Sequence, residues 1–334
     1  MSTPAVREAV DRVMGSGRYV GGPEVDALER AVGDWMGRRH GIGVSSGTTA
    51  LELALTAMGI GPGDEVILPA VSFVATLGAI LRVGATPVVV DVLDEGPWLD
   101  PAAAASALTE RTALMVPVHL FGRQAPAGHS DLPVLDDACQ AVMPGGVSVG
   151  HCSALSFYPT KLLGGPGEGG MVLTDDDELA ERLRKLRQHG ADSAGLVQVP
   201  GGTNARLGAL TAAVVRARMP AIADRMARHR VIAAAYDDAL GEHALPRAED
   251  ATVYVMRHSE RARVAGALES AGIPTAVYYP RCVHEHPAHI DRVHVPSPVT
   301  NAQRYCGEGL ALPFHAGLSD ADVAHIVTTL RAAL

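Results

Sequence analysis

The sequence predicts an α/β protein in which helices cover both faces of a mostly parallel sheet, followed by a smaller α+β domain. Between residues 41 and 174, short apolar stretches alternate with segments of helical period, as in βα repeats. At 334 residues the chain exceeds the usual size of a single core. The pattern changes after about residue 240. We therefore expect a large domain at residues 1–220 and a small domain at 221–334, with an N-terminal helix able to pack on the small domain.

Two helices are expected before the first strand. Pro4–Gly15 has an amphipathic pattern that ends at a glycine-rich turn. Pro23–Arg38 carries apolar residues at helical spacing. Residues 41–58 then predict a strand end, a turn and a third helix.

The alternation continues through the rest of the large domain. Strands are expected at residues 65–69, 86–92, 113–119, 132–136, 154–158 and 170–174, and helices at 72–82, 101–108 and 176–187. The stretch from Gly122 to Asp131 is too short for a helical crossover and contains Pro126 and Gly128, so we expect a plain loop there.

A long helical region at 207–239, interrupted by Pro220, leads into the C-terminal part. There the pattern predicts strands at Ala251–Arg257 and Thr275–Tyr279, and helices at Arg261–Ala271 and Ser319–Leu334.

Composition excludes several classes of protein. Hydrophobic residues make up 47% and charged residues 19%, which suits a folded core rather than disorder. The net charge of −9 gives no basic field for nucleic acid. No apolar run approaches the roughly 20 residues of a membrane span, and the first ten residues have no apolar signal core, so we expect a cytoplasmic protein. The four cysteines are scattered without a C-x-x-C pair, which argues against a disulfide framework or a structural zinc site.

Lysine is rare in this chain. Of 28 basic residues only Lys161 and Lys185 are lysines. A lysine can lose its proton and form a Schiff base, which arginine cannot do at neutral pH. Lys185 lies in a charged helical segment and is interpreted as a surface residue, whereas Lys161 lies between an aromatic strand end and a glycine-rich turn.

Two further motifs follow predicted strands. Ser45-Ser-Gly-Thr-Thr49 can cradle a phosphate at the start of a helix, although Ser and Thr are also ordinary helix caps. Asp136 and Asp137 end another strand, where ligands of α/β proteins bind, although either could simply cap the next turn.

Ser156 lies five residues before Lys161, with Pro159 forcing a turn between them, so a hydroxyl donor and an amine can face one cavity. A phosphate cradle, an acid for a ring nitrogen and a Schiff-base lysine are together the parts that pyridoxal phosphate (PLP) requires. The sequence therefore predicts a PLP site.

At this point the chain resembles the DegT/StrS-type sugar aminotransferases of PLP-dependent fold type I over nearly its whole length. The matching stretches are Tyr19–Val25, Gly43–Thr48, Gly59–Val66, Pro117–Gly122, Asp136–Gln140, Ser156–Lys161, Gly202–Arg206 and Tyr278–Pro280. Among them, Ser-Phe-Tyr-Pro-Thr-Lys161 is the most specific.

The resemblance implies a role for each matching residue. Lys161 would hold PLP through a Schiff base and shuttle the proton, and Asp137 would face the pyridine nitrogen. Gln140 would lie near the cofactor's O3′ or ring face. The phosphate would be bound by the group Gly47, Thr48 and Ser156.

Other implied roles concern the ring face and the partner subunit. Phe73 would stack on the ring, although from sequence alone plain core packing is the alternative. Asn204 would reach the phosphate in the neighbouring subunit, which makes a homodimer necessary for activity. Arg206 would fix that loop or the interface.

The implied reaction is ping-pong transfer of an amino group from glutamate or glutamine to a ketosugar, expected to be nucleotide-linked, or to a related keto-cyclitol. Two alternatives stay open: a PLP- or PMP-dependent sugar dehydratase, against which Lys161 argues, and a non-catalytic regulatory homologue.

Three departures from the family pattern surround the expected substrate end. The chain is short at Gly122–Asp131, Ala141–Pro144 replaces a frequent His-Gly, and Tyr278-Tyr279-Pro280 replaces His-Tyr-Pro. A compact acceptor is therefore a hypothesis. A histidine cluster, made of His284, His286, His289 and His294, lacks H-E-x-x-H spacing, and we expect no metal there.

Overall fold

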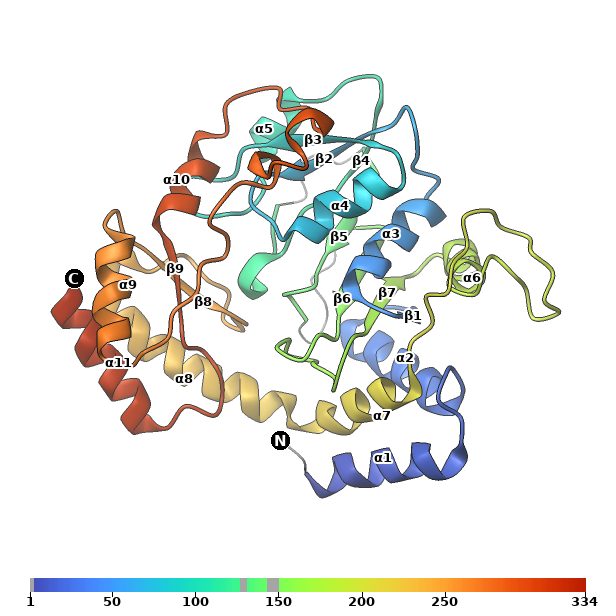
Figure 1. The fold of residues 1–334 in the computed structure, drawn as a ribbon, viewed down its shortest axis with the longest axis horizontal. Helices are drawn as coiled ribbons and strands as arrows, with labels where there is room; N and C mark the ends of the chain where they lie inside the picture. The colour runs from blue at the N-terminus through green and yellow to red at the C-terminus, as the bar shows by residue number, and fades with distance from the viewer. Residues whose placement is uncertain (1–2, 127–130, 143–149) are drawn as a thin grey trace.

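The computed structural model describes residues 3–126, 131–142 and 150–334 (Figure 1). The helices are α1 (Pro4–Ser16), α2 (Pro23–Met36), α3 (Gly47–Ala57), α4 (Val74–Arg82), α5 (Pro101–Ser106), α6 (Asp177–Leu186), α7 (Ala209–Arg218), α8 (Ile222–Leu240), α9 (Arg261–Ser270), α10 (Thr300–Glu308) and α11 (Asp320–Ala333). The strands are β1 (His40–Val44), β2 (Glu65–Pro69), β3 (Thr86–Val90), β4 (Thr112–Met115), β5 (Leu135–Asp137), β6 (Cys152–Ser156), β7 (Gly170–Thr174), β8 (Tyr254–Arg257) and β9 (Gly309–Leu312).

The central sheet has the spatial order β3-β2-β4 followed by β5-β6-β7-β1. Parallel bridges from Met115 to Val134 and from Val118 to Asp137 join the two halves. The pairs β2–β3, β2–β4 and β5–β6 are parallel, while β7 runs against both of its neighbours, β6 and β1. The predicted mostly parallel α/β sheet is therefore confirmed.

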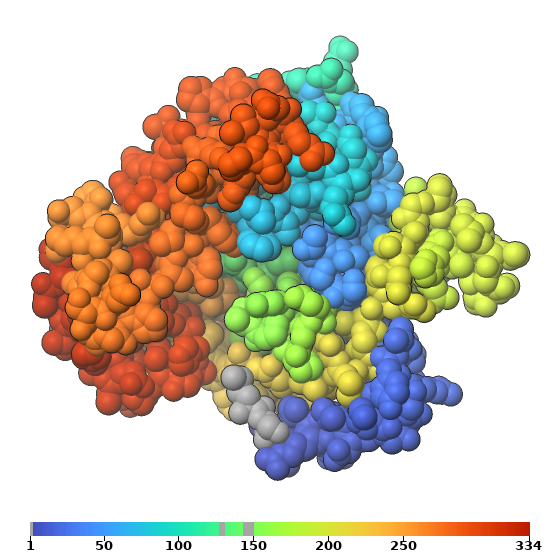
Figure 2. All heavy atoms as spheres, in the orientation of Figure 1, coloured from blue at the N-terminus to red at the C-terminus, as the bar shows by residue number. Residues whose placement is uncertain are grey.

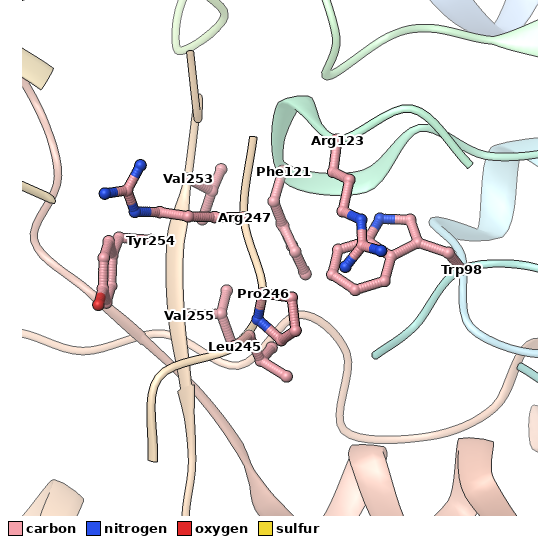
Figure 3. A pocket seen from close by; sticks show the side chains of 9 residues that line it. All are labelled: Trp98, Phe121, Arg123, Leu245, Pro246, Arg247, Val253, Tyr254 and Val255. Carbon is pink, nitrogen blue, oxygen red and sulfur yellow. The ribbon is translucent and has the colours of Figure 1, made fainter. Parts of the chain in front are cut away.

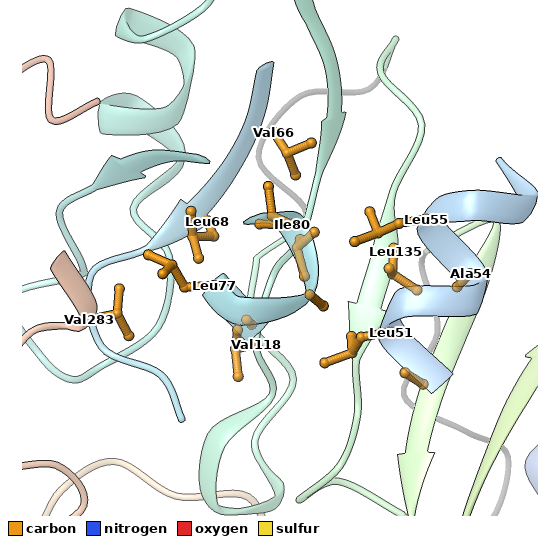
Figure 4. Close-up of a cluster of buried hydrophobic side chains, with 14 of the residues drawn as sticks. Leu51, Ala54, Leu55, Val66, Leu68, Leu77, Ile80, Val118, Leu135 and Val283 are labelled. Carbon is orange, nitrogen blue, oxygen red and sulfur yellow. The ribbon is translucent and has the colours of Figure 1, made fainter. Parts of the chain in front are cut away.

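Helices α3 and α4 pack their apolar sides onto this sheet (Figure 4). Their periodic Leu, Ile and Ala residues meet valines and leucines of the strands, and each fully buried Leu contributes about 2 kcal/mol. The cluster in view includes Leu51, Ala54, Leu55, Val66, Leu68, Leu77, Ile80, Val118, Leu135 and Val283. This packing fixes the starts of α3 and α4 at the sheet edge where strands β1, β5 and β6 end.

The C-terminal part has a core of its own. Helix α8 leads from α7 to β8, β9, α9 and α11, which group at one side of the molecule (Figure 1). The antiparallel pair β8–β9 packs with buried Tyr236, Tyr254 and Leu330. Helix α1 packs against α7 through Ala9, Val13, Ala209 and Ala213.

One predicted strand is wrong. Thr275–Tyr279 forms no strand; only Ala276 pairs with β9, through two hydrogen bonds to Ala311 (3.1 and 2.7 Å). Pro274 and Pro280 bound this stretch and cannot donate to a ladder. The two tyrosines form other hydrogen bonds: the Tyr278 carbonyl accepts from the Tyr305 hydroxyl, and Tyr279 bonds with Gln140.

The loop predicted at Gly122–Asp131 can be followed in part. Arg123–Pro126 has no helix, and residues 127–130 lie outside the described residues. Met143 and Pro144 of the Ala141–Pro144 departure also lie outside them. Within the described residues, no helix has both the length and the apolar character needed to cross a bilayer.

Candidate active site

Most predicted site residues lie near one edge of the central sheet. Strands β1, β5 and β6 run in the same direction, since β5 and β6 are parallel and β7 opposes both β6 and β1. Their carboxyl ends carry Ser45, Asp137 and Ser156, as α/β ligand sites require. On the face shown in Figure 2, the green segment that follows β6 lies between the blue N-terminal helices, the cyan region of α4 and the orange C-terminal part.

The start of α3 forms the predicted phosphate cradle. Ser46 caps the helix by accepting a hydrogen bond from the Thr49 N–H (3.0 Å). The first N–H groups of a helix have no partner within it and carry its positive end, so Gly47 and Thr48 present backbone donors suited to an anion.

Gly47 brings this turn against β6. A Cβ at Gly47 would lie 2.9 Å from Ser156 Cβ and 2.9 Å from Cys139 Sγ, distances that side chains do not tolerate. The Ser156 hydroxyl therefore lies directly beside the helix start. A glycine at this position explains how the turn and the hydroxyl come close enough to share one phosphate.

The two neighbouring aspartates have different surroundings. Asp136 is fully buried and accepts hydrogen bonds from the Gly150 N–H (3.0 Å) and the Ser153 hydroxyl (3.1 Å), with His119 Nε2 3.2 Å from its other oxygen. Asp137 is 5% exposed and accepts from the Thr76 hydroxyl (2.7 Å) and the Cys139 N–H (3.2 Å).

No Arg, Lys or His in the described part of the chain forms an ion pair with Asp137. A buried carboxylate without a cation is costly, so Asp137 suits a ligand that brings a positive charge, such as a protonated pyridine nitrogen. Asp136 already has its partners. The geometry thus distinguishes the two acids and agrees with the predicted role of the second.

Lys161 lies in a tight turn after β6. Its N–H donates to the Tyr158 carbonyl and its carbonyl accepts from the Gly164 N–H, both at 2.9 Å. Two arginines from the α7–α8 region hold the same turn: Arg225 donates to the Leu162 carbonyl (2.7 Å) and Arg218 to the Gly164 carbonyl.

Cys139 connects Lys161 with Asp137 electrostatically. Burial raises the pKa of the Cys139 thiol well above its ordinary value, the Asp137 charge raises it further, and the Lys161 charge opposes both. Both charges therefore lie close enough to act on one thiol, so the predicted amine and the predicted acid belong to one site.

Gln140 and Phe73 lie beside Tyr279, which reaches the site from the C-terminal part. The Gln140 side chain accepts from the Phe121 N–H (3.0 Å) and donates to the Tyr279 hydroxyl (3.2 Å). Phe73 is 55% exposed, with its ring centroid 6.0 Å from that of Tyr279. Plain core packing of Phe73 is thus not observed, and its open face can receive a planar ring.

Asn204 is the predicted site residue that forms no contact with the others. It is exposed, and its side chain accepts from the Arg206 guanidinium (3.1 and 2.9 Å). The neighbouring Ala205 carbonyl accepts from the Ser45 N–H (2.9 Å), so this segment runs beside the end of β1. A role toward a partner subunit stays a prediction.

Sequence reasoning missed several residues of the site. Thr76 and Ser72 were assigned only to a helix, yet their hydroxyls lead to Asp137. Tyr279 was placed in a strand. A spacing of four between two hydroxyl residues around Phe73 was the available signal for the first pair, because residues four apart share a helix face.

The histidine cluster shows no metal-ligand arrangement. Across residues 3–126, 131–142 and 150–334, no three His, Cys, Asp or Glu side chains are grouped to hold an ion. Burial lowers the pKa of His284 and of His289, which favours their neutral forms.

A small pocket lies behind the site, between the large sheet and segment 245–255 (Figure 3). The Arg123 guanidinium lies over the Trp98 ring, 4.1 Å from its centroid, and Phe121 forms the wall shared with Gln140. The pocket's apolar lining shows how closely the C-terminal part packs against the large sheet.

Comparison with known proteins agrees with this geometry. The model of the DegT/DnrJ/EryC1/StrS aminotransferase family matches residues 2–331. The chain is 39% identical to the erythromycin biosynthesis sensory transduction protein EryC1 of Saccharopolyspora erythraea, over 98% of this chain and 94% of that protein. It is 36% identical to a dTDP-3-amino-3,4,6-trideoxy-alpha-D-glucose transaminase of Streptomyces venezuelae, over 97% and 90% of the two chains.

Solved structures share the fold. The crystal structure of DesV from S. venezuelae, in complex with a ketimine intermediate, is 33% identical, with a TM-score of 0.91 over 98% of this chain and 93% of that one. The structure of ntda from Bacillus subtilis, 27% identical with a TM-score of 0.88 over 98% and 81% of the chains, contains the cofactor PMP. The fold is thus that of the PLP-dependent fold-type I enzymes, and the chain belongs to the DegT/DnrJ/EryC1/StrS aminotransferase family.

Proposed function

We propose that this enzyme transfers an amino group from glutamate or glutamine to a ketosugar, with PLP bound at the edge of the sheet where Lys161 and Asp137 lie. The observation that carries the proposal is the pair of unlike charges around Cys139: a lysine in a rigid turn and a buried carboxylate that lacks a cation. The relatives support the sugar acceptor, since one is named as a transaminase of a dTDP-linked sugar.

Bound PLP would supply an electron sink and a temporary carrier for the amine. The start of α3, with Gly47, Thr48 and Ser156, would bind its phosphate. Phe73 would cover one face of the ring and Gln140 would lie near its O3′. Each of these groups lies on a helix start or strand end and is positioned before any ligand binds.

Lys161 would move the proton in both half-reactions. Its Nζ would take the proton from Cα of the amino donor and return one at the new amine-bearing carbon of the acceptor. The turn held by Arg225 and Arg218 fixes the backbone from which this side chain reaches. Asp137 would keep the ring nitrogen protonated throughout.

The half-reactions can be followed separately by absorbance. PLP-loaded protein should absorb at about 420 nm and shift toward about 330 nm when glutamate or glutamine is added. Addition of a dTDP-linked ketosugar should restore the first band. Absence of any shift with every amino donor tried would contradict the proposal.

The acceptor's size is tested in the second half-reaction. The short Gly122–Asp131 segment supports a compact acceptor, whereas the named relative supports a nucleotide-linked one. Rates of band recovery with a dTDP-linked ketosugar, the free ketosugar and a keto-cyclitol decide between them. Equal or faster recovery with the nucleotide-linked compound would contradict the compact acceptor.

The lysine pair provides a matched control. Lys161→Ala should lower turnover by at least about 10³-fold, because the variant has no group to move the proton. Lys185→Ala should keep normal turnover, since that side chain bonds only with Gln198 (2.9 Å) and Glu181 (3.7 Å) on the surface.

A further inference from the structure

A chain of hydroxyl groups ends on the Asp137 carboxylate. The Thr76 hydroxyl lies 2.7 Å from Asp137 Oδ2, and the Ser72 hydroxyl lies 2.6 Å from that of Thr76. All three residues are buried, with exposed fractions of 1% for Thr76, 2% for Ser72 and 5% for Asp137. Short bonds in a buried place make this a fixed arrangement rather than a surface contact.

The donors and acceptors in this chain have one consistent order. An ionised carboxylate can only accept, so Thr76 must donate its proton to Asp137. The Thr76 oxygen is then left as the acceptor for Ser72, whose hydroxyl donates to it. Ser72 therefore orients Thr76, and Thr76 stabilises the charged form of Asp137 by a charge-assisted hydrogen bond.

The other polar groups around Asp137 stay neutral. Burial raises the pKa of the Cys139 thiol and of the Tyr279 hydroxyl, and in both cases the Asp137 charge adds to the effect. The Cys139 N–H donates to Asp137 Oδ1 at 3.2 Å. Thus the Thr76 hydroxyl and one backbone N–H stabilise this carboxylate before a ligand binds.

The first turn of α4 positions both faces of the arrangement. Phe73 caps the helix with an exposed ring, and the Thr76 N–H donates back to the Phe73 carbonyl (3.1 Å). Ser72 and Thr76 direct their hydroxyls to Asp137, whereas Phe73, between them in sequence, stays outside. One turn therefore sets the acid and the expected stacking ring together.

We propose that Thr76, oriented by Ser72, is a positioning residue that keeps Asp137 ionised and aimed at the ring nitrogen of PLP. This inference rests on the proposed function. When a carboxylate and a pyridine nitrogen share one proton, a hydroxyl donating to the carboxylate favours the state in which the proton is on nitrogen. Without that hydroxyl, the same proton moves from the ring nitrogen toward Asp137 Oδ.

The test measures the protonation of the ring nitrogen directly. Wild-type protein and its variants are loaded with PLP labelled with ¹⁵N in the ring, and the ¹⁵N chemical shift is recorded at one pH. Wild type should show a pyridinium. Thr76→Val, which keeps the side-chain shape, should shift the signal toward that of neutral pyridine, and turnover should fall about tenfold or more.

Three further variants make the reading specific. Thr76→Ser should restore the pyridinium signal, and Ser72→Ala should shift it in the same direction as Thr76→Val but less. Thr56→Val, which removes a hydroxyl that bonds only to the Glu52 carbonyl (2.9 Å), should leave it unchanged. If Thr76→Val does not fold in a thermal unfolding scan, Ser72→Ala carries the test.

The outcomes separate this inference from the proposed function. Loaded wild type with a pyridinium signal that is the same in Thr76→Val, or in Ser72→Ala where that variant carries the test, would overturn the role of Thr76 alone. Wild-type protein that takes up no PLP would overturn the proposed function and this role with it.

Discussion

At the scale of single residues, the contrast between Asp136 and Asp137 shows what the sequence can and cannot provide. The pair at a strand end predicted an acid in a ligand site, and the family resemblance pointed to the second. Only the fold shows the reason. Asp136 already bonds with Gly150, Ser153 and His119, whereas Asp137 has two weakly compensating donors and no cation. Alternation along β5 turns the two side chains to opposite faces of the sheet.

Gly47 gives a residue-scale prediction. Gly47→Ala would place a methyl group 2.9 Å from both Ser156 and Cys139, so the turn must move away from β6. We expect a loss of about 1–3 kcal/mol in the free energy of unfolding and weaker PLP binding. Urea titration and cofactor titration measure the two effects.

Gly78→Ala is the matched control. A Cβ at this helical glycine meets nothing within 4 Å, so we expect equal or slightly greater stability and unchanged cofactor affinity. Similar behaviour of the two variants would contradict the close approach of α3 to β6.

At the scale of elements, periodicity located the helices and strands of the large domain, with ends moved by a few residues. Pattern failed at Thr275–Tyr279, because hydrogen bonds from Tyr305 and Gln140 decide the path of the tyrosines. It also gave no sign that α4 supplies Thr76 to Asp137, since that contact joins residues 61 apart in sequence. Local pattern therefore predicts elements, whereas contacts between elements build the site.

Helix α8 carries a buried histidine with a pH-dependent effect. His229 is 6% exposed, its ring lies 4.6 Å from that of Phe314, and Nδ1 is 3.3 Å from the Ala251 carbonyl. Burial lowers its pKa, with Arg225 and His315 adding to the shift.

The unfolded chain therefore takes up a proton near the ordinary histidine pKa of about 6.5, while the folded protein does so only at lower pH. Stability from the neutral ring is present above that value and is lost as the pH falls through the lowered pKa. His229→Gln should thus reduce the fall in urea midpoint between pH 7 and pH 5. The exposed His325→Gln should not, and equal slopes for His229→Gln and wild type would contradict the account.

At the scale of the whole molecule, the division into domains near residue 220 and the homodimer both stay predictions. The core around Tyr236, Tyr254 and Leu330 is separate from the main cluster, which supports the division. The exposed Asn204, close in sequence to a segment that pairs with β1, is compatible with a reach into a partner's site. Sequence could predict neither contact geometry between domains nor between copies, because both depend on surfaces that only the fold brings together.

Mixing two variants tests the shared site. If each site takes Lys161 from one subunit and Asn204 from the other, Lys161→Ala and Asn204→Ala chains form a mixed dimer with one complete site. Refolding them together in equal amounts should restore about a quarter of wild-type turnover, because about half of the dimers are mixed and each has one working site. Activity no greater than the average of the two separate variants would contradict the shared site.

The central claim is that Lys161 carries the cofactor, and its most direct measurement is reductive trapping. PLP-loaded protein is treated with borohydride, which fixes a Schiff base as a stable amine, and its peptides are analysed by mass spectrometry. The account predicts one pyridoxyl phosphate group, on the peptide that contains Lys161. A label on the peptide with Lys185, or none on either lysine, would contradict it.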